Sequence, residues 1–83
     1  MANTWHVYMV ECADGTLYSG ITTDIDRRIK EHNESDKGAR YTRAKRPVLL
    51  VYSEEHADRS AASKREYELK QLSREEKKKL FSN

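Results

Sequence analysis

Residues 5–21 read WHVYMVECADGTLYSGI, and this stretch decides the fold because it predicts two strands joined by a turn. Trp5–Cys12 is rich in aromatic and β-branched residues, and Leu17–Ile21 is a second, shorter strand candidate. Between them, Ala13–Thr16 contains Gly15, which adopts a positive φ at little steric cost. The stretch therefore predicts a β-hairpin.

The length of the turn decides where two tyrosines lie. With a three-residue loop, Tyr8 pairs with Gly20, and Tyr8 and Tyr18 become diagonal neighbours on one face of the sheet. With a two-residue Asp14-Gly15 turn, the register shifts by one and the tyrosines lie on opposite faces. Tyrosine is also a good strand former, so packing alone is a sufficient reason for both residues.

Downstream of the hairpin, the sequence predicts a helix, an irregular segment and a third strand. The helix covers about residues 24–34, with Thr22 or Thr23 as its N-terminal cap. Residues 35–47 hold the only proline and are expected to be irregular. Val48–Glu54 begins with a continuous apolar run, which predicts a central strand.

The rest of the chain predicts two helices. Asp58 or Ser60 caps the first, which runs to about Leu72, and Ser73–Glu76 is a capping box that opens a short last helix. The length of 83 residues suits one domain, residues 1–83. The fold class is α/β in the α+β sense: a small three-stranded, mainly antiparallel sheet flanked by helices, in the order β-β-α-β-α-α.

Charge is distributed unevenly along the chain, although the formal net charge is only +2. Residues 1–26 carry a net charge of −4, residues 27–47 a net charge of +5, and residues 48–83 a net charge of +1. The central basic block is either a binding surface for phosphate or a solvated loop. The charge pattern by itself leaves both interpretations open.

The sequence favours the cytoplasm. Its one cysteine, Cys12, excludes an internal disulfide and suits a reducing compartment. The longest apolar run, residues 48–52, is far shorter than the roughly 20 residues that a membrane helix needs. The first residues lack the basic and apolar regions of a secretory signal. We therefore expect a cytoplasmic protein without a membrane segment.

The first expected helix carries polar residues beside its apolar face. Ile25, Ile29 and His32 form one stripe of the helical period. Arg28 lies on the margin of that stripe, whereas Arg27 faces solvent. Because Arg28 and His32 are four residues apart, their side chains can approach one point beside the core. The alternative is a core histidine with an ordinary hydrogen bond and a surface arginine with a buried stem.

The second long helix shows the same anomaly with the opposite charge. Ala62, Leu69 and Leu72 form its apolar stripe, and Glu66 lies within it. Glutamate is almost never fully buried unless it is paired or bound to a metal. Glu66 is thus either in a salt bridge to an arginine across the core or a carboxylate that faces a cleft as metal ligand or general base.

These residues together resemble the GIY-YIG nuclease domain in its small stand-alone form. The resemblance rests on His6-Val7-Tyr8, Tyr18-Ser19-Gly20, Arg28, His32 and Glu66, and it extends from about Thr4 to about Leu80. The first motif has His-Val-Tyr in place of Gly-Ile-Tyr, and the second has Tyr-Ser-Gly in place of Tyr-Ile-Gly. Both tyrosines and the last glycine are retained.

The resemblance implies a metal-dependent phosphodiesterase and a role for each residue. Tyr8 and Tyr18 would line the scissile phosphate, and one of them would orient or activate the attacking water. Arg28 would contact the phosphate oxygens, and His32 would assist proton transfer. Glu66 would hold one divalent cation, Mg²⁺ or Mn²⁺.

Three hypotheses follow from these residues. The first is an endonuclease of low sequence specificity that acts on DNA in repair or recombination, with nicked, branched or single-stranded forms as substrates and a protein partner supplying specificity. The second is a nucleic-acid-binding module with weak or no catalysis, and the third is an interaction protein with a buried polar network. The residues expected to contact nucleic acid are Lys37, Arg40, Tyr41, Arg43, Lys45 and Arg46.

Overall fold

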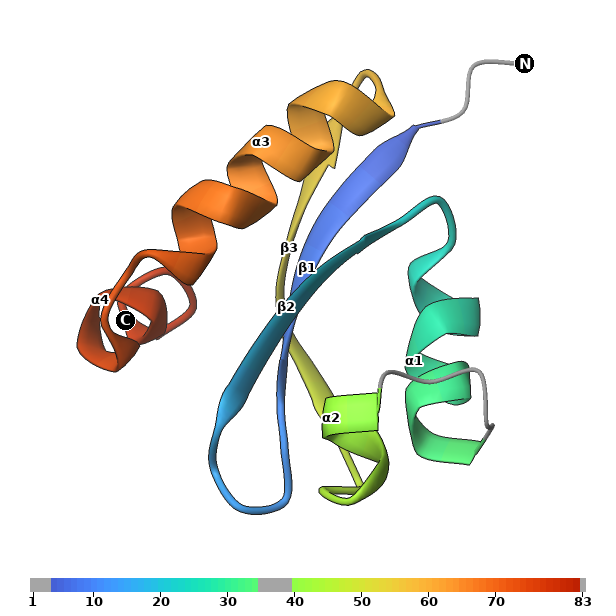
Figure 1. Cartoon of the computed structure of the whole chain (residues 1–83), viewed down its shortest axis with the longest axis vertical. Helices are drawn as coiled ribbons and strands as arrows, with labels where there is room; N and C mark the ends of the chain where they lie inside the picture. Colours follow the sequence, from blue (N-terminus) through green and yellow to red (C-terminus); the bar gives the residue numbers. More distant parts are fainter. Residues whose placement is uncertain (1–3, 35–39, 83) are drawn as a thin grey trace.

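The computed structural model describes residues 4–34 and 40–82. Its sheet is antiparallel and has the strand order β2-β1-β3 (Figure 1), with β1 (Trp5–Glu11), β2 (Leu17–Thr22) and β3 (Leu49–His56). The helices are α1 (Ile25–Glu34), α2 (Arg40–Arg43), α3 (Arg59–Lys70) and α4 (Arg74–Lys78). The predicted fold class is confirmed, and the short helix α2 is an addition in a segment that we expected to be irregular.

The hairpin has the register of the three-residue loop. Gly15 has a φ of 85°, and the Cys12 amide donates to the Thr16 carbonyl at 2.8 Å. Tyr8 consequently pairs with Gly20. Tyr8 and Tyr18 therefore lie on the same face of the sheet, one of the two arrangements that the sequence left open.

The third strand lies at the edge of the sheet, so its predicted central position is wrong. β1 pairs with both other strands, and its residues 7–10 are buried. The apolar run of β3 instead leaves Leu49 65% exposed and Leu50 42% exposed. The register of β1 with β3 shifts between Met9 and Val10, next to these leucines. The apolar run belongs to an edge strand here. Which strand is central is decided by strand pairing, and pairing depends on residues far away in the sequence.

The sheet separates two cores. On one face, α3 packs over the apolar cluster of Val7, Met9, Ala62 and Leu69. On the other face, where α1 and α2 lie, a second cluster contains Tyr8, Val10, Cys12 and Val48. Figure 1 shows α3 and α4 on one side of the strands and α1 and α2 on the other. Among the described residues, no helix has the length and apolar character needed to span a bilayer.

The helix caps agree with the sequence at two of three positions. The Asp58 side chain accepts a hydrogen bond from the Ala61 amide and caps α3, and Ser73 with Glu76 forms the predicted capping box of α4. At α1 the cap is Asp24, whose Oδ1 accepts from the Arg27 amide at 3.1 Å, so the expectation of a threonine cap is wrong. Thr22 Oγ1 accepts from the Asp24 amide at 3.1 Å, which orients the capping residue.

Candidate active site

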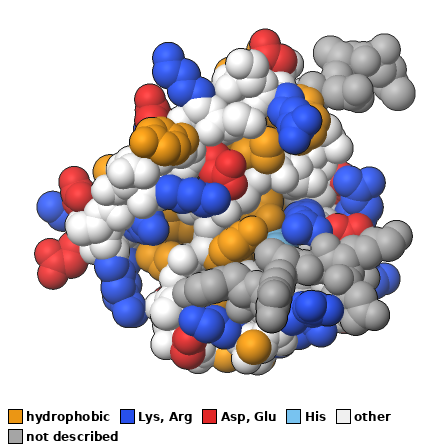
Figure 2. Space-filling model, viewed as in Figure 1, with side chains coloured by type: hydrophobic (Ala, Val, Ile, Leu, Met, Phe, Trp, Pro, Cys, Tyr) orange, Lys and Arg blue, Asp and Glu red, His pale blue; other side chains and the backbone are white. Residues whose placement is uncertain are grey.

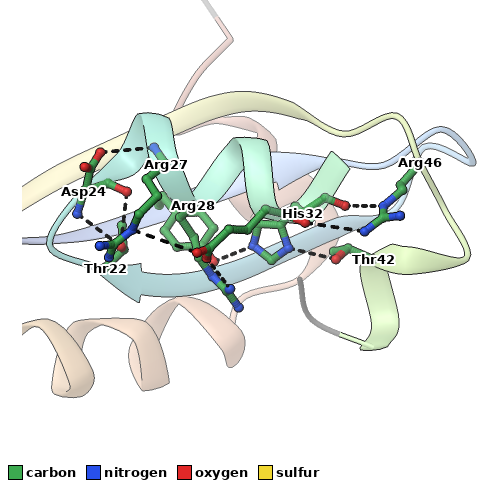
Figure 3. A network of polar contacts seen from close by, with 9 residues as sticks. Thr22, Asp24, Arg27, Arg28, His32, Thr42 and Arg46 are labelled. Carbon is green, nitrogen blue, oxygen red and sulfur yellow. Dashed lines mark hydrogen bonds and ion pairs between the residues drawn. The ribbon is translucent and has the colours of Figure 1, made fainter. Parts of the chain in front are cut away.

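A chain of three buried polar side chains crosses the interior between β1, α1 and α2. The Tyr8 hydroxyl lies 2.7 Å from His32 Nε2, and His32 Nδ1 lies 2.8 Å from Thr42 Oγ1 (Figure 3). Tyr8 is 1% exposed, and His32 and Thr42 are 0% exposed. Because the interior offers these groups no water, each depends on the others to satisfy its hydrogen bonds.

Burial keeps the His32 imidazole neutral near pH 7. Desolvation, with the positive charges of Arg28 and Arg46 nearby, lowers the pKa of His32 to about 4. A neutral imidazole has one N–H donor and one acceptor nitrogen. If Nδ1–H donates to Thr42, then Nε2 accepts the hydroxyl proton of Tyr8. In that tautomer, His32 is the proton acceptor of the chain.

Arg28 is the charged member of the site. Burial raises the pKa of Tyr8 to about 12, and the Arg28 guanidinium, which hydrogen-bonds the Tyr8 hydroxyl, partly offsets that rise. Arg28 Nη1 also donates to Glu31 Oε1 at 2.9 Å, and its side chain is 24% exposed. Arg27, one residue earlier, is 59% exposed, so the helical phase placed these two arginines as the structure shows them. Figure 3 shows Arg28 and His32 on the same helix, α1.

Gly20 makes room for the Tyr8 ring. A Cβ atom at Gly20 would lie 2.7 Å from Tyr8 Cζ and would overlap the Tyr8 hydroxyl. Only glycine therefore lets the phenol lie across β2 and reach His32. The glycine of the Tyr18-Ser19-Gly20 motif is therefore required by this steric contact and not by a positive φ.

Tyr18 completes an aromatic group around His32. Its ring lies edge-on to the imidazole, with 5.6 Å between centroids and an interplanar angle of 72°. The Tyr8 ring lies 5.7 Å from the same imidazole at 57°. The structure therefore brings together Tyr8, Tyr18, Arg28 and His32, four of the residues on which the resemblance to the GIY-YIG domain rests.

Glu66 approaches the site from α3. Its side chain is 22% exposed, and its charge acts on Tyr8 by raising the pKa of the phenol. The carboxylate pairs with Lys70 of the same helix at 3.3 Å, and no ion pair from Glu66 to an arginine across the core is present in the described residues. The predicted alternative of a salt bridge across the core is therefore not seen among the described residues, and a role of Glu66 as metal ligand or general base stays a prediction.

The donor set fits a hard divalent cation with few protein ligands. No group of three or more His, Cys, Asp or Glu side chains suited to a metal occurs within residues 4–34 and 40–82. Glu66 offers one half-buried carboxylate, held only by an exposed lysine. Mg²⁺ commonly keeps several waters and uses one or two carboxylates, so a single glutamate suffices for it. A Zn²⁺ or Ca²⁺ site needs more ligands than these residues supply.

The basic residues expected to contact nucleic acid are not equivalent. Arg43 is exposed, whereas Lys45 Nζ pairs with Asp14 Oδ2 at 3.0 Å. Arg46 Nε donates to the His32 carbonyl at 2.5 Å and thereby covers the end of α1 (Figure 3). The side chains of Arg40 and Tyr41 lie outside the described part of the structure, as does the whole of Lys37.

Two site residues were missing from the sequence-based set. Thr42 binds His32 but stands in a short basic segment without periodicity, so no pattern indicated its burial. Asn33 holds the residue that precedes β3: its Oδ1 accepts from the Val48 amide at 2.7 Å, and its Nδ2 donates to the Val48 carbonyl at 3.1 Å. This contact fixes α1, and with it His32, against the sheet.

The fold and this constellation define the GIY-YIG catalytic domain, and the sequence model of that family matches residues 4–79. The chain therefore belongs to the GIY-YIG catalytic domain family.

Its relatives include proteins named UPF0213. The UPF0213 protein DP2720 of Desulfotalea psychrophila is 68% identical over 76 residues, which cover 92% of this chain and 69% of the relative. The UPF0213 protein VNG_2274C of Halobacterium salinarum is 54% identical over 76 residues, covering 92% and 97%. The match thus spans most of this chain in both cases.

Two solution NMR structures share the fold. The UPF0213 protein BH0048 of Bacillus halodurans has a TM-score of 0.58 and 48% identity, with 93% of this chain and 81% of that chain covered. The protein EF2693 of E. faecalis has a TM-score of 0.61 and 36% identity, with 96% and 88% covered. The architecture of this chain is therefore the one found in these two structures.

Proposed function

We propose that this protein is a metal-dependent endonuclease that hydrolyses DNA phosphodiester bonds with low sequence specificity. The observation that carries the proposal is the buried chain Tyr8–His32–Thr42, with Arg28 bound to its phenolic end. Such a chain is costly to bury unless every group is satisfied. The same hydrogen-bonded groups can pass a proton from one to the next beside a charged substrate.

The reaction needs a water oxygen to attack phosphorus while the bond from phosphorus to the leaving oxygen breaks. Tyr8 orients that water through its hydroxyl oxygen, and the proton released passes toward Tyr8 and His32 Nε2. With Nδ1–H donating to Thr42 Oγ1, His32 would be in the tautomer that accepts this proton. A positioned acid–base group of this kind contributes roughly 10²–10⁴-fold to a rate.

Arg28 is suited to the phosphate. A guanidinium offers a planar fork of donors that fits phosphate oxygens and the charge that builds up on them. Glu31 holds the Arg28 guanidinium by a 2.9 Å contact, which limits the orientations that the side chain can adopt. Tyr18 packs edge-on against the His32 imidazole and would line the same phosphate.

Glu66 is the residue that would hold one Mg²⁺ or Mn²⁺ ion. When bound there, the cation would supply stabilisation of the negative charge on the leaving 3′ oxygen. Lys70 must release the carboxylate, which its 50% exposed side chain can do at small cost because surface ion pairs are weak.

The substrate range follows from the basic residues. Arg43 is the exposed cation of the described basic segment and would contact the DNA backbone, together with Lys37, Arg40 and Tyr41. Backbone contacts carry no sequence information, so specificity for nicked, branched or single-stranded DNA would come from shape or from a protein partner. A role in DNA repair or recombination in the cytoplasm fits this chemistry and the single cysteine.

One observation favours a second function, a binding module with weak or no catalysis. The Glu66 carboxylate already has a cationic partner in Lys70, which competes with a metal ion. The two functions share the fold and the basic surface. They differ in whether cleavage depends on Glu66.

The test is cleavage of supercoiled plasmid and branched oligonucleotides in Mg²⁺ or Mn²⁺. We expect nicking by the wild-type protein and a loss of at least about 100-fold in Glu66→Gln. Glu68→Gln is the matched control, because it removes the same charge from an exposed position of the same helix. Cleavage that is unchanged in Glu66→Gln would refute the site. Salt-sensitive binding without any cleavage would instead support the binding module.

A further inference from the structure

A basic concavity lies where β2 leaves the hairpin turn, on the side of the sheet that α3 and α4 cover. It is a cavity of about 200 Å³ lined by Thr16, Leu17, Arg74 and Lys77. The hairpin supplies one wall, and α4 supplies the two cations. Neither Arg74 nor Lys77 has a part in the chemistry derived above.

The two cations of this cavity are not neutralised by carboxylates. No ion pair of Arg74 or Lys77 occurs among the described residues. Asp14, in the adjacent turn, is engaged by Thr16 and Lys45, and its hydrogen bonds to them lower its pKa to about 2. The nearby carboxylate is therefore already occupied.

The Arg74 side chain lies against the hairpin turn. Its Nη2 lies 3.4 Å from the position that a Cβ atom would have on Gly15, which is ordinary van der Waals contact. Lys77 lines the same cavity beside Leu17, where its aliphatic stem can pack. Two adjacent cations at a defined hollow form a better receptor for an anion than scattered surface lysines do.

The cavity lies close to the candidate active site along β2. Leu17 precedes Gly20 by three residues on this strand, which corresponds to about 10 Å at roughly 3.3 Å per residue. Leu17 packs on the α3 side of the sheet and Gly20 faces Tyr8 on the other side, so the cavity and the tyrosine lie on opposite sides of the edge strand β2. Figure 2 shows lysine and arginine side chains over α3 and α4 as well as over α1 and α2 on the face that carries β2.

We propose that the cavity of Thr16, Leu17, Arg74 and Lys77 binds a backbone phosphate of the DNA whose cleavage is proposed above. This inference rests on the proposed function. The arginine fork and the lysine point charge both suit a phosphodiester oxygen. Such a contact fixes the path of the DNA past the edge strand β2 and contributes affinity without sequence preference.

The experiment measures DNA binding in a Glu66→Gln background, so that the result does not depend on cleavage. The probe is a fluorescent 12-nucleotide single-stranded DNA, titrated at several salt concentrations. We expect Arg74→Ala/Lys77→Ala to weaken binding about 10-fold at low salt and to reduce the slope of log affinity against log salt by about 1. Lys78→Ala/Lys79→Ala is the matched control, since it removes two charges from the end of α4 outside the cavity.

A second measurement uses the unaltered sequence and does not depend on how the variants fold. Titration of the wild-type protein with the same DNA in the absence of divalent cations should shift the amide resonances of Thr16, Leu17 and Arg74. Equal binding by the two double variants, or no shift at these amides, would overturn the proposal. Either result is distinguishable from failure of the proposed function, which is decided by whether cleavage depends on Glu66.

Discussion

The two faces of the sheet bury different kinds of side chain. The face under α3 is apolar, with four side chains at 0% exposure: Val7, Met9, Ala62 and Leu69. The face under α1 and α2 buries Tyr8, His32 and Thr42 in one hydrogen-bonded chain. The side chains named on both faces are shielded from water. The two faces therefore differ in how much free energy of folding their buried groups contribute.

Apolar burial stabilises the fold, whereas polar burial contributes little even when it is satisfied. A fully buried Val, Leu or Met side chain contributes about 1.5–3 kcal/mol. A satisfied hydrogen bond adds only about 0.5–1.5 kcal/mol, and an unsatisfied buried group costs about 1–3 kcal/mol. The α3 face therefore holds the domain together, and the α1 face carries the groups suited to proton transfer, whereas the carboxylate proposed for a cation, Glu66, belongs to α3.

The largest expected effect is on the apolar face. Leu69→Ala leaves a cavity under α3 and should lower the free energy of unfolding by about 2–5 kcal/mol in urea titrations. Tyr67→Ala, at a position of the same helix that is 67% exposed, should change it by less than about 0.5 kcal/mol. A small effect of Leu69→Ala would mean that the α3 face does not dominate stability.

Acid should weaken the two faces in different pH ranges. His32 has a folded pKa of about 4 against an ordinary value of 6.5, so it contributes stability above pH 6.5 that is lost as pH falls toward 4. That loss is about 3 kcal/mol at 1.36 kcal/mol per unit. Urea midpoints measured between pH 7 and pH 4 should fall in the wild type and fall less in His32→Gln.

On the α3 face, Glu54 titrates lower. Burial by itself raises its pKa, but hydrogen bonds from Arg65, Tyr52 and His56 together lower it to about 2 from 4.5. Its contribution is therefore present above pH 4.5 and is lost between about pH 4.5 and 2. A wild-type midpoint that stays constant from pH 7 to pH 5 would contradict the neutral, buried state of His32.

A smaller effect on the free energy of unfolding is expected for substitutions at Gly20 and Ser19 of β2, which face opposite sides of the sheet. Gly20→Ala forces its new methyl group against the Tyr8 ring and should cost about 1–3 kcal/mol while breaking the contact of Tyr8 with His32. Ser19→Ala is the adjacent control on the other face. Ser19 Oγ is buried and lacks a hydrogen-bond partner in the described residues, so its removal should be neutral or stabilising. Equal unfolding free energies for the two variants would refute the steric role of Gly20.

The smallest effects separate two arginines of the basic segment. Arg46→Ala removes donors from the carbonyls of Glu31 and His32 and should lower the free energy of unfolding by about 1 kcal/mol with little change in the salt dependence of DNA binding. Arg43→Ala, at an exposed position, should change the free energy of unfolding by less than about 0.5 kcal/mol and reduce the salt slope by about 1. Urea titrations and salt-dependent DNA binding of the two variants test this difference. A larger loss of stability in Arg43→Ala, with the larger change of salt slope in Arg46→Ala, would contradict the prediction.

Local patterns predicted most of the fold and much of the candidate site. The turn glycine allowed the hairpin register, and helical phase separated Arg28 from Arg27 and placed His32 inside. Both depend on residues close in sequence, where periodicity and turn chemistry act directly.

Two of the misses, the edge position of β3 and the burial of Thr42, depend on contacts between separate elements, and the third, the cap of α1, depends on a local hydrogen bond. The apolar start of β3 could not show that this strand pairs on one side only. Thr42 is buried because His32, ten residues earlier, needs a partner, and no periodicity in a short basic segment carries that information. Asp24 rather than a threonine caps α1 because Thr22 orients it through a hydrogen bond.

The measurement that tests the central claim most directly is the single-turnover cleavage rate of Tyr8→Phe beside its free energy of unfolding. The change removes one hydroxyl from the polar face and leaves the ring in place across Gly20. We predict a rate at least about 100-fold below wild type, with a loss of stability of no more than about 1–3 kcal/mol from the unpaired His32 nitrogen. Tyr52→Phe, which removes a hydroxyl bound to Glu54, should cleave at the wild-type rate. Wild-type cleavage by Tyr8→Phe would contradict the assignment of the polar face to catalysis.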